Sequence, residues 1–177
     1  MKFWVALFSQ TGSEIHQVSE KVGRYPDMIL CNKQDDFESI NSNLIGKTSI
    51  IFTDKVPTID QYLQHIPEDA LVTMHGWLRI VPGEVCDKRN IYNGHPGLIT
   101  KYPELKGKDP QLKAYKLELQ TSGCIIHKVI AEVDSGDVIL EKEVSIKGLQ
   151  LGRVIENLHD TSVELWCEFL TDKFNER

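Results

Sequence analysis

This sequence lacks zinc-ligand spacing, a dense set of cysteines and a block of basic residues. The four cysteines stand far apart, with neither CxxC pairing nor a histidine at zinc spacing; they are Cys31, Cys86, Cys124 and Cys167. This spacing excludes a zinc ribbon and a dense disulfide framework, so we expect reduced, mostly packed thiols and no metal site. The 20 Lys and Arg are outnumbered by 26 Asp and Glu, which gives a net charge of −6 without any basic block. A nucleic-acid partner is therefore not indicated.

Long hydrophobic runs are also lacking. The N-terminal apolar run, Phe3–Phe8, is too short to cross a membrane, and the polar cluster Ser9–Gly12 follows where a signal peptide would continue. We therefore expect a cytoplasmic protein without a membrane partner. A chain of 177 residues has ordinary single-domain size, so we expect residues 1–177 to form one domain. No feature of the sequence points to a particular oligomeric state.

Short apolar runs alternate with segments of helical periodicity along the chain. This alternation predicts an α/β fold with a mostly parallel, twisted sheet flanked by helices. The continuous run Phe3–Phe8 predicts a central strand, and the last two strands predict a hairpin at the sheet edge. Strands are predicted at residues 3–8, 28–31, 48–52, 71–74, 91–93, 124–133 and 138–144, and helices at residues 13–23, 58–66, 110–121 and from 151 onward.

Local signals predict several helix boundaries. Ser13 is expected to cap the first helix, and Asp109 to cap a later helix that begins at Pro110 and is broken by Ser122-Gly123. The polar segment 32–43 is expected to hold only a short or irregular helix. The predicted apolar faces are Leu112, Tyr115 and Leu119 in the later helix, and Leu151, Val154, Ile155, Leu158, Leu165, Trp166, Phe169 and Leu170 in the last helix.

Three loops are expected at the carboxyl ends of strands, where ligands bind in such sheets. Ser9–Ser13 leads from a strand into a helix, so the backbone amides of residues 10–13 would suit an anion such as phosphate. A plain strand-to-helix turn explains this loop equally well. The partly apolar loop His75–Val81 fits the wall of a pocket for a flat ligand or a cap over the core. With Asn93–His95 as the third loop, the sequence predicts one shared cleft.

Asn93, His95 and Asp134 are the candidate catalytic residues. An Asn can polarise a carbonyl, a His can move a proton, and an Asp on a nearby loop can hold the imidazole in one tautomer. The competing interpretation is ordinary turn chemistry at Asn-Gly and Asp-Ser-Gly. His75 and His127 have no motif partner in the sequence, and we interpret both as structural.

These motifs, in this order, resemble those of the folate-dependent formyltransferases, most closely the phosphoribosylglycinamide (GAR) formyltransferase branch. The resemblance covers nearly the whole chain and implies a Rossmann-like fold. It implies transfer of a formyl group from 10-formyltetrahydrofolate, the cosubstrate, to a primary amine of a small phosphorylated substrate in purine biosynthesis. The matching segments are Ser9-Gln10-Thr11-Gly12-Ser13, Gly76-Trp77-Leu78-Arg79-Ile80, Asn93-Gly94-His95-Pro96, Lys101-Tyr102-Pro103 and Asp134-Ser135-Gly136-Asp137-Val138-Ile139.

The resemblance also implies a role for each residue. Asn93 would stabilise the oxyanion, His95 would pass the proton, and Asp134 would fix the His95 ring or a bridging water and favour its imidazolium form. The residues implied for folate binding are Trp77, Leu78, Arg79, Ile80, Val81 and Val133. The residues implied for acceptor binding are Gln10, Thr11, Gly12, Ser13 and His159.

Departures from the GAR pattern affect the acceptor side. Glu14 stands where those enzymes have Asn, and Leu158-His159 stands where they have a Glu-His pair that holds the substrate ribose. The segment 104–110 also lacks their usual Gly-Leu-His run. We expect GAR use to be weakened by about two orders of magnitude, or another acceptor such as an amino-sugar nucleotide.

Two further functions stay open from the sequence. Hydrolysis of formyltetrahydrofolate, as in the related deformylases, would use the same Asn, His and Asp on water. A folate- or nucleotide-binding protein without turnover is the alternative outside enzymology. The intact Asn93, His95 and Asp134 argue against the second.

Overall fold

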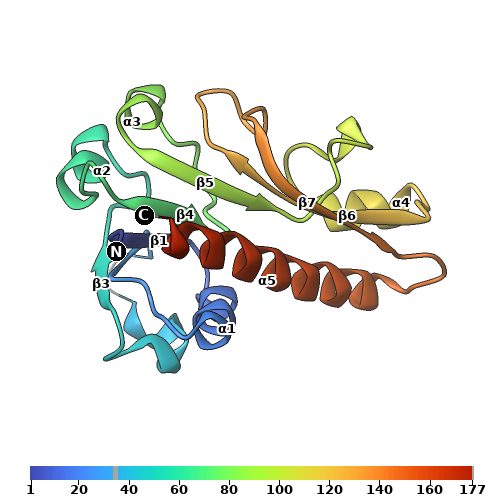
Figure 1. The fold of residues 1–177 in the computed structure, drawn as a ribbon. Coiled ribbons are helices and arrows are strands. Elements are labelled where there is room, and N and C mark those ends of the chain that lie inside the picture. The colour runs from blue at the N-terminus through green and yellow to red at the C-terminus, as the bar shows by residue number, and fades with distance from the viewer. Residues whose placement is uncertain (34–35, 177) are drawn as a thin grey trace.

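The protein is built on one twisted sheet, and β1 (Trp4–Phe8) is the middle strand of its parallel part (Figure 1). The computed structural model describes residues 1–33 and 36–176, and in them the strand order is β3-β2-β1-β4-β5-β6-β7. The first five strands in this order are parallel to one another. Strand β6 pairs antiparallel with β5, and β7 pairs antiparallel with β6. The predicted fold class, central strand and edge hairpin are confirmed. The remaining strands are β2 (Met28–Cys31), β3 (Ser49–Phe52), β4 (Leu71–Met74), β5 (Asn90–His95), β6 (Thr121–Lys128) and β7 (Val138–Ser145).

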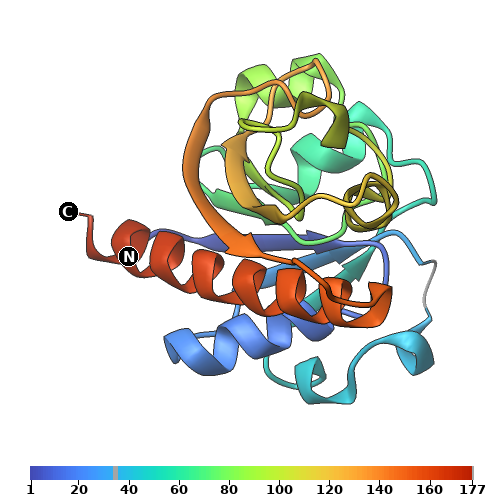
Figure 2. The same ribbon diagram turned by 90° about the vertical axis from the view of Figure 1, so that its right-hand side faces the viewer.

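Helices cover both faces of the sheet, as the turned view shows (Figure 2). Because side chains alternate along a strand, Trp4, Ala6 and Phe8 of β1 pack in the core under α1 and α5. Val5 and Leu7 pack in the second core, under α2 and α3. The helices are α1 (Ser13–Val22), α2 (Ile59–His65), α3 (Gly83–Lys88), α4 (Pro110–Lys116) and α5 (Leu151–Asn175).

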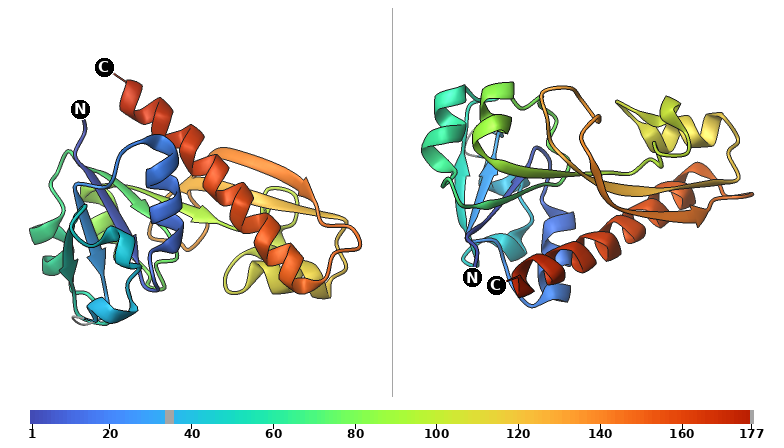
Figure 3. Two further views of the ribbon diagram at one scale, coloured as in Figure 1. Left: turned by 90° about the horizontal axis from the view of Figure 1, so that it is seen from below. Right: turned by 45° about the horizontal axis from the view of Figure 1, so that its top comes forward.

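Helix α5 runs diagonally along the sheet and lies beside α1 (Figure 3). Its buried face contains most of the predicted apolar positions, including Leu158 and Trp166, which are fully buried. Ile155 is an exception to the prediction, because it is 45% exposed. Lys2 Nζ lies 3.0 Å from Glu176 Oε2, so the two ends of the chain meet. Of the helices in the described residues, none has the length and hydropathy that a membrane crossing requires.

Two predicted helix boundaries are corrected by the structure. Gly12, rather than Ser13, occupies the N-cap position of α1, and Ser13 is the first helical residue. Asp109 does precede a helix that begins at Pro110, in a left-handed conformation with φ of 51°. That helix ends at Lys116, however, so Leu119 lies beyond it, and Tyr115 is 37% exposed.

Ser122-Gly123 does not break a helix but lies inside β6. At Gly123 the β6 backbone passes so close to β7 that an added Cβ would lie 2.1 Å from Lys142 O. The glycine therefore permits close strand pairing rather than ending an element.

The short elements agree in part with the prediction. The segment 32–43 holds two 3₁₀ turns, Phe37–Ser39 and Ser42–Leu44, while residues 34 and 35 lie outside the described residues. The six-residue α3 was not predicted, since Val85 is its single buried residue and gives no apolar period. All four cysteines are free thiols as expected, with Cys31 and Cys124 buried.

Candidate active site

Strand β5 delivers Asn93 and His95 to the sheet edge where β1 and β4 also end. Asn93 pairs with Met74, the last residue of β4, so β5 continues past its neighbour and carries His95 beyond it. Residues two apart on a strand share a face, which places both side chains on one side of the sheet. His95 is nevertheless only 6% exposed.

His127 completes this group from the next strand. It pairs directly with Asn93 across the β5–β6 ladder, and its Nε2 lies 3.3 Å from Asn93 Nδ2. Its Nδ1 donates to Lys128 O at 3.0 Å, and Nε2 accepts from the Asn93 amide. His127 therefore has a side-chain partner that its sequence context did not reveal, and we infer that it helps to place Asn93. The one sequence signal was an imidazole inside a buried apolar strand.

The His95 ring is oriented by a backbone carbonyl. Its Nε2–H donates to Leu105 O at 2.8 Å, and the other nitrogen, Nδ1, faces Asp134 Oδ1 at 3.7 Å. The second distance is too long for a direct hydrogen bond. We expected Asp134 to fix the ring or a bridging water. The structure corrects the first alternative, because Leu105 O fixes the ring and Asp134 faces the nitrogen that can take a proton without bonding it directly, whereas the bridging water stays a prediction.

Asp134 sits between the two histidines. Its Oδ1 is 3.6 Å from His127 Nε2, its Oδ2 accepts from the Gly107 N–H at 2.8 Å, and its side chain is 8% exposed. Burial alone would raise the pKa of Asp134, but His127, His95 and the Gly107 N–H together hold that pKa below its usual range. The carboxylate is therefore charged. We call Asn93, His95, His127 and Asp134 the Asp134 cluster.

The loop that carries Asp134 folds back tightly on β6. Asp134 has a positive φ of 53°, and Asp137 O accepts from the Lys128 N–H at 2.9 Å. At Gly136 an added Cβ would lie 1.6 Å from Lys128 O, so only glycine allows this approach. The tight Asp-Ser-Gly turn therefore places the Asp134 carboxylate.

The charge of His95 is set by two opposing effects. Burial lowers the pKa of His95 below its usual value, and this outweighs the Asp134 carboxylate and the Leu105 carbonyl, both of which raise it. Asp134 thus favours imidazolium, as expected from the sequence, but the resting ring is neutral. A neutral ring with a free Nδ1 can accept a proton.

The loops predicted for folate and for the anion are joined to each other. Ser9 N donates to Gly76 O at 3.1 Å, and the Leu78 N–H donates to Ser9 Oγ at 2.9 Å. These loops follow β1 and β4, and β5 is the next strand, so all three predicted loops lie at one sheet edge. A hollow of about 330 Å³ lies beside them and is lined by Ser9, Asn32, Lys33, Lys55, Leu78 and Arg79.

The predicted folate-binding side chains fall into two groups. Leu78, Ile80 and Val133 are 64%, 70% and 49% exposed, so they offer an apolar surface. Trp77 and Val81 are buried instead, and the Trp77 indole donates to Tyr62 Oη at 3.1 Å. Their side chains form core under α2, so the expected lining by the whole loop is corrected.

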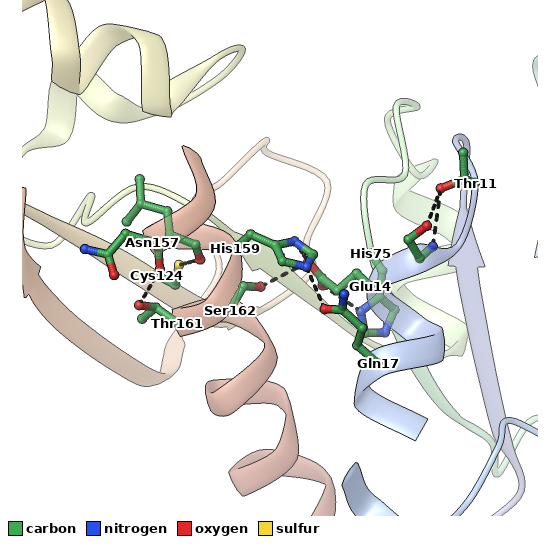
Figure 4. A network of polar contacts seen from close by, with 11 residues as sticks. Thr11, Glu14, Gln17, His75, Cys124, Asn157, His159, Thr161 and Ser162 are labelled. Carbon is green, nitrogen blue, oxygen red and sulfur yellow. Dashed lines mark hydrogen bonds and ion pairs between the residues drawn. The ribbon is translucent and has the colours of Figure 1, made fainter. Parts of the chain in front are cut away.

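The predicted acceptor side begins at the start of α1. Thr11 Oγ1 lies 2.9 Å from Ser13 Oγ and accepts from the Ser13 N–H at 3.3 Å. Glu14 Oε1 accepts from His75 Nδ1 at 3.1 Å, and Ser162 Oγ donates to Glu14 Oε2 at 3.3 Å (Figure 4). His75 therefore has a charged partner that its sequence context did not reveal.

Comparisons with known proteins agree with this geometry. The sequence profile of the formyl transferase family matches residues 47–169. Phosphoribosylglycinamide formyltransferase of Dictyostelium discoideum is 38% identical over 84 residues, which are 43% of this chain and 41% of that enzyme. The trifunctional purine biosynthetic protein adenosine-3 of Homo sapiens is 33% identical over 91 residues, 50% of this chain and 9% of that protein.

A solved structure extends the likeness to the whole chain. The crystal structure of phosphoribosylglycinamide formyltransferase from Campylobacter jejuni superposes with a TM-score of 0.82 at 25% identity, over 99% of both chains. The family profile covers more than half of this chain and includes Asn93, His95, His127 and Asp134. The chain therefore belongs to the formyl transferase family.

Proposed function

We propose that this protein transfers the formyl group of 10-formyltetrahydrofolate to the primary amine of phosphoribosylglycinamide, a reaction of purine biosynthesis. The observation that carries the proposal is the Asp134 cluster, in which an amide, a neutral imidazole and a charged carboxylate converge at the end of β5. One relative and one whole-chain structural neighbour, both phosphoribosylglycinamide formyltransferases by name, support the choice of acceptor.

Asn93, His95 and Asp134 each have a chemical task in this proposal. As the neutral amine attacks the formyl carbon, Asn93 Nδ2 donates to the developing oxyanion, a contribution of about 3–4 kcal/mol in comparable sites. His95 Nδ1 takes the proton that the amine loses, and Asp134 stabilises the resulting imidazolium from 3.7 Å. The carbon–nitrogen bond to folate then breaks, and His95 returns the proton to the departing nitrogen.

The exposed apolar side chains define where folate would bind. Leu78 and Ile80 follow β4, Val133 immediately precedes Asp134, and all three side chains are exposed, so they can cover a flat ring. Arg79 lines the hollow beside the loop that follows β4. Burying each such aliphatic side chain contributes roughly 1–2 kcal/mol of binding. The phosphate of the acceptor is assigned to the start of α1, at Thr11 and Ser13, where the helix N-terminus favours an anion.

The test is the release of tetrahydrofolate from 10-formyltetrahydrofolate with and without phosphoribosylglycinamide, together with calorimetry of a folate analogue. We expect the analogue to bind and release to depend on the amine. Release that does not depend on the amine would indicate hydrolysis, and absence of folate binding at millimolar ligand would exclude both reactions. Asn93→Ala provides an inactive control that still binds folate.

A further inference from the structure

Position 158, which carries a ribose-holding carboxylate in the pattern that this sequence resembles, is part of the core here. Leu158 is fully buried, and its carbonyl accepts from Cys124 Sγ at 3.1 Å. Its side chain packs with α5 and β6 in the core on that face of the sheet. No acceptor group for a ligand is offered from this position.

A carboxylate nevertheless reaches the neighbouring residue of α5 from another helix. Glu14 projects from the first turn of α1, and its Oε2 lies 3.9 Å from Nδ1 of His159, the residue after Leu158 (Figure 4). The Glu14 and His159 side chains are 25% and 36% exposed, so both are open to solvent. We call Glu14, His75, His159 and Ser162 the Glu14 cluster.

The Glu14 carboxylate is held in position from behind. The Trp4 indole, which can only donate, donates to Thr73 Oγ1 at 2.9 Å, and that hydroxyl lies 2.8 Å from His75 Nε2. The Thr73 hydroxyl can therefore donate to Nε2, which leaves the ring proton on Nδ1 to be donated to Glu14 at 3.1 Å. This buried chain fixes one carboxylate oxygen and leaves the other near the surface.

The groups that face solvent in this cluster accept hydrogen bonds. A carboxylate has about four acceptor sites, and His75 and Ser162 use two of those on Glu14. His159 Nε2 lies 2.8 Å from Gln17 Oε1, an acceptor, so Nε2 carries a proton and Nδ1 faces Glu14 across a gap too long for a direct hydrogen bond. A hydroxyl placed beside this pair can donate to Glu14 Oε2. A phosphate, which is itself an anion that accepts hydrogen bonds, does not fit there.

We propose that Glu14 binds the sugar hydroxyls of the formyl acceptor, and so supplies from α1 the carboxylate that position 158 lacks. This inference rests on the proposed function. It assigns two adjacent subsites: donors at Thr11 and Ser13 for the phosphate, and acceptors at Glu14 and His159 for the ribose. The carboxylate gained at Glu14 then compensates for the one absent at Leu158, and phosphoribosylglycinamide remains a good substrate.

The test compares the natural acceptor and its deoxy analogues on three proteins. The acceptors are phosphoribosylglycinamide and analogues that each lack one ribose hydroxyl. The proteins are the wild type, Glu14→Gln, and Glu20→Gln as a matched control on the exposed side of α1. Gln at position 14 keeps a carbonyl to accept from His75, so the fold should persist, which thermal melting by circular dichroism checks.

For the wild type and for Glu20→Gln, we expect removal of the bound hydroxyl to lower kcat/KM by about 10- to 100-fold, chiefly through KM. Glu14→Gln should lose a similar factor with the natural acceptor. It should discriminate little between that acceptor and the analogue that lacks the bound hydroxyl.

Three results would overturn the inference. The first is a Glu14→Gln variant with the wild-type KM for phosphoribosylglycinamide. The second is a wild type that uses every deoxy analogue as well as the natural acceptor, and this result is decisive even if Glu14→Gln does not fold. In both, transfer by the wild type leaves the proposed function intact. A wild type that formylates none of these acceptors would overturn the proposed function and this inference together.

Discussion

The Asp134 cluster and the Glu14 cluster use the same side-chain types but differ in what holds them. Each pairs one carboxylate with two histidines. In the Asp134 cluster both rings donate to backbone carbonyls, those of Leu105 and Lys128, and the carboxylate accepts from a backbone N–H. In the Glu14 cluster the rings contact side chains, Thr73 and Gln17.

This difference has a consequence for function. A geometry fixed by the backbone depends on the fold, so single side-chain substitutions nearby should change it little. A geometry fixed by side chains changes with single substitutions, so it can be altered to suit the acceptor. The predictions below test this division between chemistry and acceptor recognition.

The largest effect is expected in the Asp134 cluster. Asn93→Ala, His95→Ala and Asp134→Ala should each lower kcat by about 10²- to 10⁴-fold and leave folate binding nearly unchanged, because these groups act in the transition state. Steady-state kinetics and calorimetry measure the two quantities. The triple variant should be far faster than the product of the three factors predicts. Purely multiplicative losses would show that the residues do not act as a unit.

The next effect concerns stability on the acceptor side. Leu158→Glu should lower the free energy of unfolding by about 2–5 kcal/mol, because it places a carboxylate in a fully buried position. Leu158→Met should cost less than about 1.5 kcal/mol and serves as the control. Urea titration measures both. A stable Leu158→Glu protein would mean that position 158 can face the site, which would remove the need for Glu14.

His127 should matter less than His95 because it positions Asn93 and Asp134. We expect His127→Ala to lower kcat by about 10- to 100-fold, the usual result of slight misplacement of catalytic groups. His16→Ala, on α1 with a contact to Tyr25, is a control histidine outside both clusters. An unchanged kcat in His127→Ala would restore the structural interpretation of this residue.

The smallest effect is a shift in titration. The pKa of His95 should lie below the ordinary value of about 6.5, because burial disfavours its charged form. Asp134→Asn removes a negative charge that stabilises imidazolium, so it should lower this pKa further. NMR titration of the His95 ring measures the shift directly. A pKa that rises in Asp134→Asn would contradict the assigned contact.

The sequence predicted the elements whose cause is local. Continuous apolar runs marked β1 and β4, and the turn residues marked the Asp134 loop. The sequence did not predict the side-chain contacts that strand register determines. His127 meets Asn93 because β6 pairs antiparallel with β5, and no spacing within either strand encodes that pairing.

The same limit explains the other corrected predictions. Leu105 reaches His95 only because the 3₁₀ turn Pro103–Leu105 packs against the end of β5. Gly123 was interpreted as a breaker because its close neighbour, Lys142, lies on another strand. Candidate catalytic residues were recoverable from motif order, whereas the partner that orients each of them required the fold.

The most direct test of the central claim follows the formyl carbon itself. The protein would be incubated for a single turnover with 10-formyltetrahydrofolate labelled in the formyl group and with excess phosphoribosylglycinamide, and the label would be located by mass spectrometry. Our account predicts label on the acceptor amine in equal amount to the tetrahydrofolate released, and loss of both signals in His95→Ala. Label recovered as free formate, at a rate that does not depend on phosphoribosylglycinamide, would contradict it.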